Sequence, residues 1–130
     1  MSSRGAVTQN GHATTDEYET SKYIYDAEVL VGKNGRHSLP DYSHSPNSKY
    51  IKENPDGTFR ELRDFNEKGY PIIEIAYHIE PSLTGNRCDY VLHYHYFEPG
   101  LVRKMGGRVS PTENSEIYEK YKKYLEVYGL

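Results

Sequence analysis

The 130-residue sequence contains no tryptophan, only three phenylalanines and a single cysteine, Cys88. One cysteine excludes both an intrachain disulfide and a cysteine-rich zinc site. The hydrophobic fraction is only 35%, whereas 14 residues are tyrosines. A core that takes its apolar area from tyrosines must also supply partners for their hydroxyl groups. The length and composition therefore predict one domain with a modest, partly hydrated interior.

The sequence also lacks an excess of positive charge and any long apolar run. Its net charge of −3 excludes the broad basic surface of a non-specific nucleic-acid binder, so a site for a polyanion would have to be local. No stretch approaches the roughly 18 apolar residues of a membrane span. Residues 1–9 lack the apolar segment of a signal peptide, and we expect export, if it occurs, to depend on a segment outside this chain.

Composition divides the chain into a short leader and one domain. Residues 1–15 are rich in Ser, Thr, Gly and Asn and are typical of a flexible leader or linker remnant, which leaves residues 16–130 as a single α+β domain. Asp16–Leu30 is predicted to be a short helix, because a threonine before it can act as its cap and acidic residues follow, although "YIYDAEVLV" also has strand-like residues. Gly32–Asn47 is dense in Gly, Pro, Ser and Asn and is predicted to be a loop.

The middle of the chain, about residues 48–97, predicts a sheet. The turn sequences "PDG" and "NEKG" separate three strand-like segments, and a longer loop precedes a fourth. Strands joined by short turns form an antiparallel meander. The four expected strands are Lys49–Glu53, Thr58–Phe65, Pro71–His78 and Tyr90–Phe97.

The C-terminal region, about residues 113–128, predicts an amphipathic helix. A Ser or Thr cap and acidic residues precede apolar side chains at helical spacing, which are Ile117, Tyr121, Tyr124, Leu125 and Tyr128. The predicted fold is therefore α+β: a four-stranded antiparallel meander with an N-terminal helical segment and this C-terminal helix on one face.

Alternation along the last two predicted strands separates a core face from an open face. The core set, expected to face the helix, is Ile73, Ile75, Tyr77, Leu92, Tyr94 and Tyr96. The open set, expected to lie together in solvent, is Glu74, His78, His93 and His95. A register shift of one residue would exchange the two faces.

The open set has the groups that metal-free RNA cleavage requires. That reaction needs a base for the 2′-hydroxyl proton, an acid for the departing 5′-oxygen and a cation for the charged transition state. We expect His78 and His93 to act as acid and base in an order that the sequence does not assign, and His95 and Glu74 to tune or position them. Arg60 and Arg63 lie one on each face of the neighbouring strand, so that one of them reaches the phosphate, and Tyr77 is a further substrate-binding candidate.

The segment Lys49 to Gly100 resembles a family of bacterial toxin modules. The run "RELRDFNEKGYPIIEIAYH" followed by "LHYHYF" is similar to C-terminal modules of polymorphic toxins and phage-borne proteins of the barnase–EndoU–colicin–RelE-like ribonuclease superfamily. The resemblance implies an N-terminal helix with a four-stranded antiparallel sheet, His78, His93 and His95 at the matching positions, and an RNA substrate. It also implies action in the bacterial cytoplasm after delivery in a larger secreted or phage-associated protein. A ribonuclease would harm its producer, so we expect a cognate immunity protein that covers the open face.

Other hypotheses remain open on the sequence alone. His78, His93 and His95 could bind zinc or iron in a hydrolytic metal site, whereas the ribonuclease hypothesis requires no metal or cofactor. The H-x-H motif also occurs in cupins, although Gly85 and Glu98 do not have the cupin spacing. A phage-encoded binding or inhibitory module without catalysis would use the tyrosines as a contact surface. The remaining histidines, His12, His37 and His44, are expected to be solvated.

Overall fold

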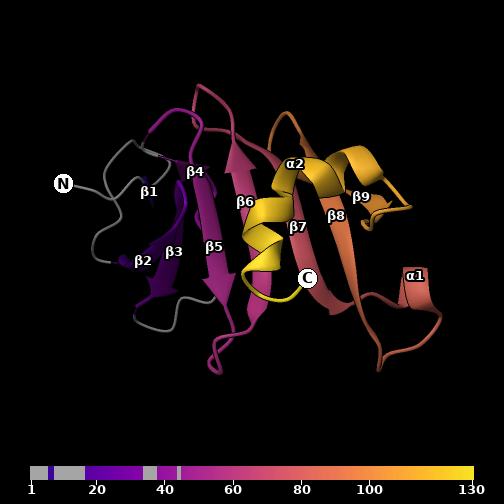
Figure 1. The fold of residues 1–130 in the computed structure, drawn as a ribbon. Helices are drawn as coiled ribbons and strands as arrows, with labels where there is room; N and C mark the ends of the chain where they lie inside the picture. The colour runs from indigo at the N-terminus through magenta and orange to yellow at the C-terminus, as the bar shows by residue number, and fades with distance from the viewer. Residues whose placement is uncertain (1–5, 8–16, 34–37, 44) are drawn as a thin grey trace.

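The computed structural model describes residues 6–7, 17–33, 38–43 and 45–130, which form two sheets and two helices (Figure 1). No helix among the described residues is long and apolar enough to cross a membrane. The elements in chain order are β1 (Ala6–Val7), β2 (Tyr18–Ile24), β3 (Ala27–Gly32), β4 (Tyr42–Ser43), β5 (Lys49–Glu53), β6 (Phe59–Phe65), β7 (Pro71–Ile79), α1 (Pro81–Thr84), β8 (Tyr90–Glu98), β9 (Val102–Arg108) and α2 (Ser115–Glu126).

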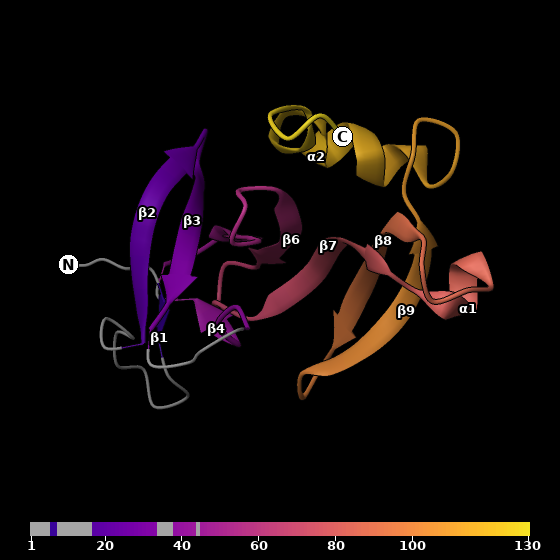
Figure 2. The same ribbon diagram turned by 90° about the horizontal axis from the view of Figure 1, so that it is seen from below.

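The main sheet has seven strands in the order β2-β3-β5-β6-β7-β8-β9. Its neighbours are antiparallel except for β3 and β5, which run parallel, so the sheet is mixed. Helix α2 lies on one side of this sheet, and α1 lies at the far end beside β9 (Figure 2). The predicted four-stranded antiparallel meander is therefore wrong, although its four strands occur as β5 to β8 within the larger sheet.

The predicted N-terminal helix over Asp16–Leu30 is also wrong, because β2 and β3 form a hairpin there. Strand β3 has buried side chains on both faces: Val29 joins the core below α2, and Leu30 joins a second cluster on the opposite side of the sheet. An extended strand projects successive side chains to opposite faces, so neighbouring residues can be buried on both sides. An amphipathic helix would bury only the side chains of one face. The β-branched and aromatic residues of this segment fit the strand.

Strand β9 is the second element absent from the predicted fold. Its sequence, "VRKMGGR", contains two glycines and three cations, so it lacks the usual signals of a strand. Its pairing with β8 contains a bulge, and a Cβ atom at Gly106 would come within 2.2 Å of the Tyr94 ring. Glycine is therefore required where the edge strand passes over this tyrosine.

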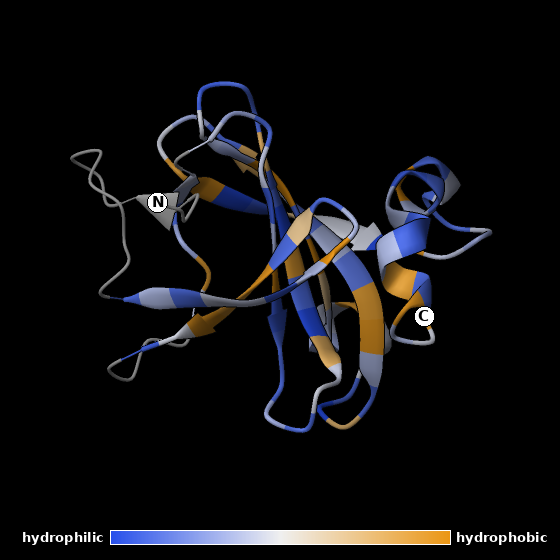
Figure 3. Cartoon of the chain, turned by 60° about the vertical axis from the view of Figure 1, so that its left-hand side comes forward, coloured by the Kyte–Doolittle hydropathy of each residue, from blue (hydrophilic) through white to orange (hydrophobic). Residues whose placement is uncertain are grey.

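Helix α2 packs its tyrosines on the main core. Tyr118, Tyr121, Tyr124 and Leu125 are buried against side chains of the sheet, which are Ile24, Ala27, Val29, Ile51, Phe59, Leu62 and Ile75. Figure 3 shows the apolar segments of the strands and of α2 facing one another. The predicted amphipathic helix is present, although its described span is Ser115–Glu126 and its N-cap is Asn114.

The hydroxyl groups of three α2-region tyrosines each donate to a carboxylate of the sheet. Tyr121 donates to Asp64 over 2.6 Å, Tyr128 donates to Glu53 over 2.7 Å, and Tyr124 donates to Asp26. Burial, followed by the hydrogen bond to its carboxylate, raises the pKa of each of these tyrosines. The hydroxyls therefore remain protonated donors, and they supply the polar partners that a tyrosine-based core needs.

Several sequence predictions concern residues outside the described part of the chain. Most of the expected leader, residues 1–15, lies there, although Ala6–Val7 pairs with β4 as strand β1. The histidines expected to be solvated, His12, His37 and His44, also lie outside the described residues.

The buried contact between Tyr121 and Asp64 gives a stability prediction. Tyr121→Phe should lower the free energy of unfolding by about 1–3 kcal/mol, because it removes a hydrogen bond to a buried carboxylate. Tyr118→Phe on the same helix is the control, since Tyr118 donates over 3.2 Å to the backbone carbonyl of the terminal Leu130, which water can solvate. Urea unfolding of both variants measures the difference. Equal losses of unfolding free energy in the two variants would show that the hydrogen bond to Asp64 stabilises the fold no more than the one to Leu130.

Candidate functional site

The pairing of β7 and β8 determines which side chains share the face opposite α2. Ile75 pairs with Tyr94, and both pack on the main core. Glu74 pairs directly with His95, and His93 pairs with Ala76. Glu74, His93 and His95 therefore lie on one face, as the alternation predicts, and the histidines are not part of the α2 core.

This face is not the solvent-open surface that the sequence predicts. Glu74 is 1% exposed, His93 2% and His95 7%. Two groups of neighbours account for the burial: Glu80 and α1 follow β7 beside His93, and arginine side chains cover Glu74. The site is consequently a buried polar cluster at the base of a pocket.

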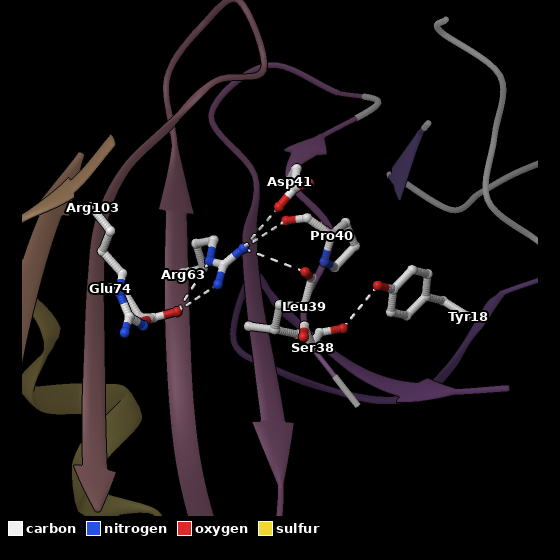
Figure 4. Close-up of polar contacts among 8 residues, drawn as sticks. All are labelled: Tyr18, Ser38, Leu39, Pro40, Asp41, Arg63, Glu74 and Arg103. Atoms are coloured by element: carbon white, nitrogen blue, oxygen red, sulfur yellow. Dashed lines mark hydrogen bonds and ion pairs between the residues drawn. The ribbon is translucent and has the colours of Figure 1, made fainter. Parts of the chain in front are cut away.

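The carboxylate of Glu74 binds two guanidinium groups (Figure 4). Its Oε2 accepts from Nη2 of Arg63 over 2.6 Å and from Nε of Arg63 over 3.2 Å. Its Oε1 accepts from Nη1 of Arg103 over 2.9 Å. Arg63 is itself buried, whereas the side chain of Arg103 on the edge strand β9 is 53% exposed. One buried carboxylate thus connects an interior cation to one that reaches solvent.

Arg63 also holds the segment before β4 against the sheet. Its Nη1 donates to the backbone carbonyls of Leu39 and Pro40 over 3.3 and 3.1 Å (Figure 4). Its guanidinium lies 5.4 Å from the ring centroid of Phe97, within the range of a cation–π contact. All of these contacts are internal, so Arg63 acts as a structural cation and is not available to a ligand.

The two histidines of β8 contact each other, and the tautomer of one can be inferred. Their ring centroids are 5.0 Å apart and the rings are nearly perpendicular. Nδ1 of His93 lies 2.8 Å from the carbonyl oxygen of Val91, and since a carbonyl only accepts, the proton is on Nδ1. In the neutral ring the lone pair of Nε2 therefore faces Glu80, whose Oε1 is 3.8 Å away. Ser82 donates to the other oxygen of Glu80, Oε2, over 2.9 Å.

These groups line a small open pocket of about 150 Å³. Its polar wall comes from β6, β7, β8, β9 and the residue after β7, namely Arg60, Glu61, Glu74, His78, Glu80, His93, His95 and Arg103. Pockets for drug-sized ligands span about 300–1,000 Å³, so this one suits a single small group such as a phosphate. A polymer could present such a group while the rest of it remains outside.

The environment of the pocket shifts two pKa values in opposite directions. Burial, followed by the positive charge of Arg103, lowers the pKa of His95, which favours a neutral imidazole. Burial, followed by the negative charge of Glu74, raises the pKa of Glu61 despite the opposing charges of Arg63, Arg60 and Lys52. The pocket therefore contains both a histidine that is harder to protonate than a free imidazole and a carboxyl group that keeps its proton to higher pH than a free glutamate does.

The predicted site residues do not all meet. His78 lines the pocket and its ring lies 5.5 Å from that of Tyr90. Tyr77 packs on the α2 core instead, which places it away from the pocket. Arg60 and Arg63 were expected on opposite faces, but a bulge in the β5–β6 pairing leaves Arg60 as the extra residue, and it lines the pocket.

Three pocket residues were absent from the predicted site: Glu61, Glu80 and Arg103. Arg103 lies on β9, and without that strand it had no predicted neighbour in the sheet. Glu80 begins a segment that was interpreted as a loop, although it directly follows the strand that carries His78. Glu61 lies at alternating positions with Arg63 and could have been found from the strand period alone.

The cluster can perform two kinds of chemistry. Two imidazoles near carboxylates and arginines can transfer protons at a bound phosphate. The ligand atoms of Glu80, His93 and His95 also lie within 4.8 Å of one another, so these residues could hold a metal ion. The metal site expected from His78, His93 and His95 is not the grouping found, because Glu80 takes the place of His78.

The double contact of Glu74 predicts a large effect of its substitution. Glu74→Gln should lower the free energy of unfolding by about 3–5 kcal/mol, because it leaves the buried guanidinium of Arg63 without a counter-charge. Arg103→Gln is the matched control, and we expect it to cost less than about 1 kcal/mol, because its side chain is half exposed. Guanidinium unfolding of the two variants gives the comparison. Similar losses of unfolding free energy in Glu74→Gln and Arg103→Gln would contradict the stabilising role of the buried Glu74–Arg63 pair.

The raised pKa of Glu61 predicts a pH-dependent stability. The folded state keeps the Glu61 proton to higher pH than the unfolded state does, so the wild-type protein loses stability as pH rises through this raised pKa. Glu61→Gln removes the ionisation, and it should be more stable than the wild type at neutral pH but similar to it near pH 4. Thermal unfolding at several pH values measures the difference, with the exposed Glu67→Gln as control. A difference in thermal stability between the wild type and Glu61→Gln that stays constant across pH would contradict the raised pKa of Glu61.

Comparison of the chain with protein-family models, with curated proteins and with solved structures found no match. The resemblance to toxin modules therefore has no support beyond the residues that suggested it. The function has to be argued from the geometry of the pocket.

Proposed function

We propose that the pocket on β6 to β9 is the active site of a toxin-like endoribonuclease that cleaves RNA without a metal ion. The observation that carries the proposal is the meeting of His78, His93 and His95 in one polar pocket, where the ring centroids of His93 and His95 are 5.0 Å apart. Arg60 and Arg103 lie on the wall of the same pocket, where they can meet a phosphate. The described part of the chain has no histidine outside this pocket.

The chemistry needs two proton carriers on different sides of the phosphate. A base removes the proton of the 2′-hydroxyl, the 2′-oxygen attacks the adjacent phosphorus, and an acid protonates the 5′-oxygen as its bond to phosphorus breaks. The products are a 2′,3′-cyclic phosphate and a free 5′-hydroxyl. His93 and His78 suit this task, because His78 pairs with Val91, two residues before His93, so the two histidines are diagonal neighbours across the strands.

The cations of the pocket would stabilise the charge that develops on the phosphate oxygens. Arg103 is suited to this role because Glu74 holds one of its nitrogens while its side chain remains half exposed. Strand β9 also carries Lys104 and Arg108, which gives this edge of the sheet a local positive charge on an acidic protein. This charge is where a polyanion would bind.

The biological setting follows from the activity. An endoribonuclease in its producing cell would attack that cell's own RNA, so the proposal includes an immunity protein that covers the pocket. It also includes action in the bacterial cytoplasm, after delivery as part of a larger secreted or phage-associated protein. Both extensions derive from the toxin resemblance and from the chemistry of the pocket.

Cleavage of RNA by the chelator-treated protein tests the function. The full chain, dialysed against EDTA, should cleave single-stranded RNA and leave cyclic phosphate ends. His78→Ala and His93→Asn should each reduce the rate by about 10²–10⁴-fold, as loss of a general acid or base does. Tyr96→Phe on the same strand as His93, and on its opposite face, is the control and should keep full activity.

Two results would contradict the proposal. Full activity in both histidine variants, with unfolding curves like that of the wild type, would remove the histidines from the mechanism. Activity that disappears with EDTA and returns with zinc or manganese would assign the pocket to a metal-dependent hydrolase. Because His93 is buried, circular dichroism must first show that His93→Asn folds, and the half-buried His78 provides the second variant.

A further inference from the structure

The pocket contains three potential ligands that converge on one point. One ligand atom each from Glu80, His93 and His95 lies within 4.8 Å of the others. We propose that these three residues bind a zinc ion, and that zinc bound there blocks RNA cleavage. The inhibition rests on the proposed ribonuclease function, whereas the binding of zinc does not.

One of the ligand–ligand distances is close to that around a bound ion, and all three are within 4.8 Å. Zinc binds imidazole nitrogen and carboxylate oxygen at about 2.0–2.2 Å, which places two ligands of a tetrahedral site about 3.3–3.5 Å apart. Nε2 of His93 and Oε1 of Glu80 are already 3.8 Å apart. Glu80 lies just after β7 with a partly exposed side chain, so a small rotation of its carboxylate can close the remaining gap.

Two of the three ligands are oriented by a second contact, as metal ligands usually are. Nδ1–H of His93 donates to the carbonyl of Val91 over 2.8 Å, which leaves the Nε2 lone pair for a metal. The hydroxyl of Ser82 donates to Oε2 of Glu80 over 2.9 Å, which leaves Oε1 facing His93. Neither contact is needed for a merely solvated histidine or glutamate.

The ligand types favour zinc over the abundant hard cations. Two nitrogens and one oxygen suit zinc, whereas magnesium and calcium prefer six or more oxygens. Three protein ligands leave a fourth position for water. The nearby charge of Arg103 opposes a cation, and the negative charges of Glu74, which binds Arg103 directly, and of Glu80 in the site itself act against this repulsion.

Zinc and RNA cleavage would compete for the same atom. A proton carrier at His93 must use the lone pair of Nε2, and a bound zinc ion would occupy that lone pair. His78 remains free, because it does not belong to the ligand group, but it would have lost its partner on β8. Zinc should therefore inhibit cleavage reversibly, and EDTA should restore it.

Isothermal titration of zinc chloride into the EDTA-treated full chain tests the site without any activity measurement. We expect one zinc ion per chain at this site. Glu80→Gln should weaken binding by more than roughly 100-fold, and Ser82→Ala, which only releases the Glu80 carboxylate, by about tenfold. His78→Asn is the matched control, since His78 lines the same pocket without belonging to the ligand group, and its affinity should not change.

Two binding results would overturn the site: no zinc binding at micromolar concentration, or equal affinity in the wild type, Glu80→Gln and Ser82→Ala. Cleavage assays then separate this inference from the ribonuclease proposal. A zinc-free protein that cleaves RNA but fails to bind zinc would leave the ribonuclease and remove the zinc site. A protein that binds zinc as expected but cleaves only with zinc bound would keep the site and overturn the inhibition.

Discussion

The buried carboxylate of Glu74 is the contact on which the sheet face opposite α2 depends. Through Arg63 it connects to the backbone of Leu39 and Pro40, and through Arg103 it connects to the edge strand β9. Burying the charges of Glu74 and Arg63 costs desolvation, and an apolar replacement of such a pair is often equally stable. The value of this arrangement is therefore positional, because it brings a half-exposed guanidinium to the wall of the histidine pocket.

The two faces of the sheet provide partners for their buried polar groups in different ways. Under α2, tyrosine hydroxyls donate to carboxylates of the sheet, of which Tyr121 and Asp64 are the most buried pair. On the other face, the carboxylate of Glu74 pairs with two arginines, and His93 lies near Glu80, the residue before α1. A chain that has no tryptophan and is only 35% hydrophobic thus reaches a packed interior by pairing nearly every polar group that it buries. The histidine pocket lies where this pairing leaves imidazole atoms facing an open space.

About half of the sheet and most of the histidine face could be predicted from the sequence. Strands β5 to β8 have clear turns and alternation, so their positions and the core face of β7 and β8 were predictable, whereas the register of β7 against β8 was left open. The β2–β3 hairpin was not predictable, because a segment that mixes polar and apolar residues in this way fits a helix or a strand until its pairing is seen. Strand β9 was not predictable either, since Gly106 and its cations are unusual in a strand and are explained only by the ring of Tyr94 and by Glu74.

By itself the sequence determined which side chains share a face within β7 and within β8, because the twofold period of a strand depends only on local geometry. Glu74 was placed with His93 and His95 because the apolar side chains of both strands were expected on the core face. Only the tertiary structure decided that these groups are buried, that Arg63 is an internal cation, and that Glu80 and Arg103 complete the pocket. Those features depend on contacts between residues that are distant in the sequence, such as Arg103 with Glu74 and Arg63 with Leu39. Local patterns of charge and hydrophobicity have no information about such distant partners.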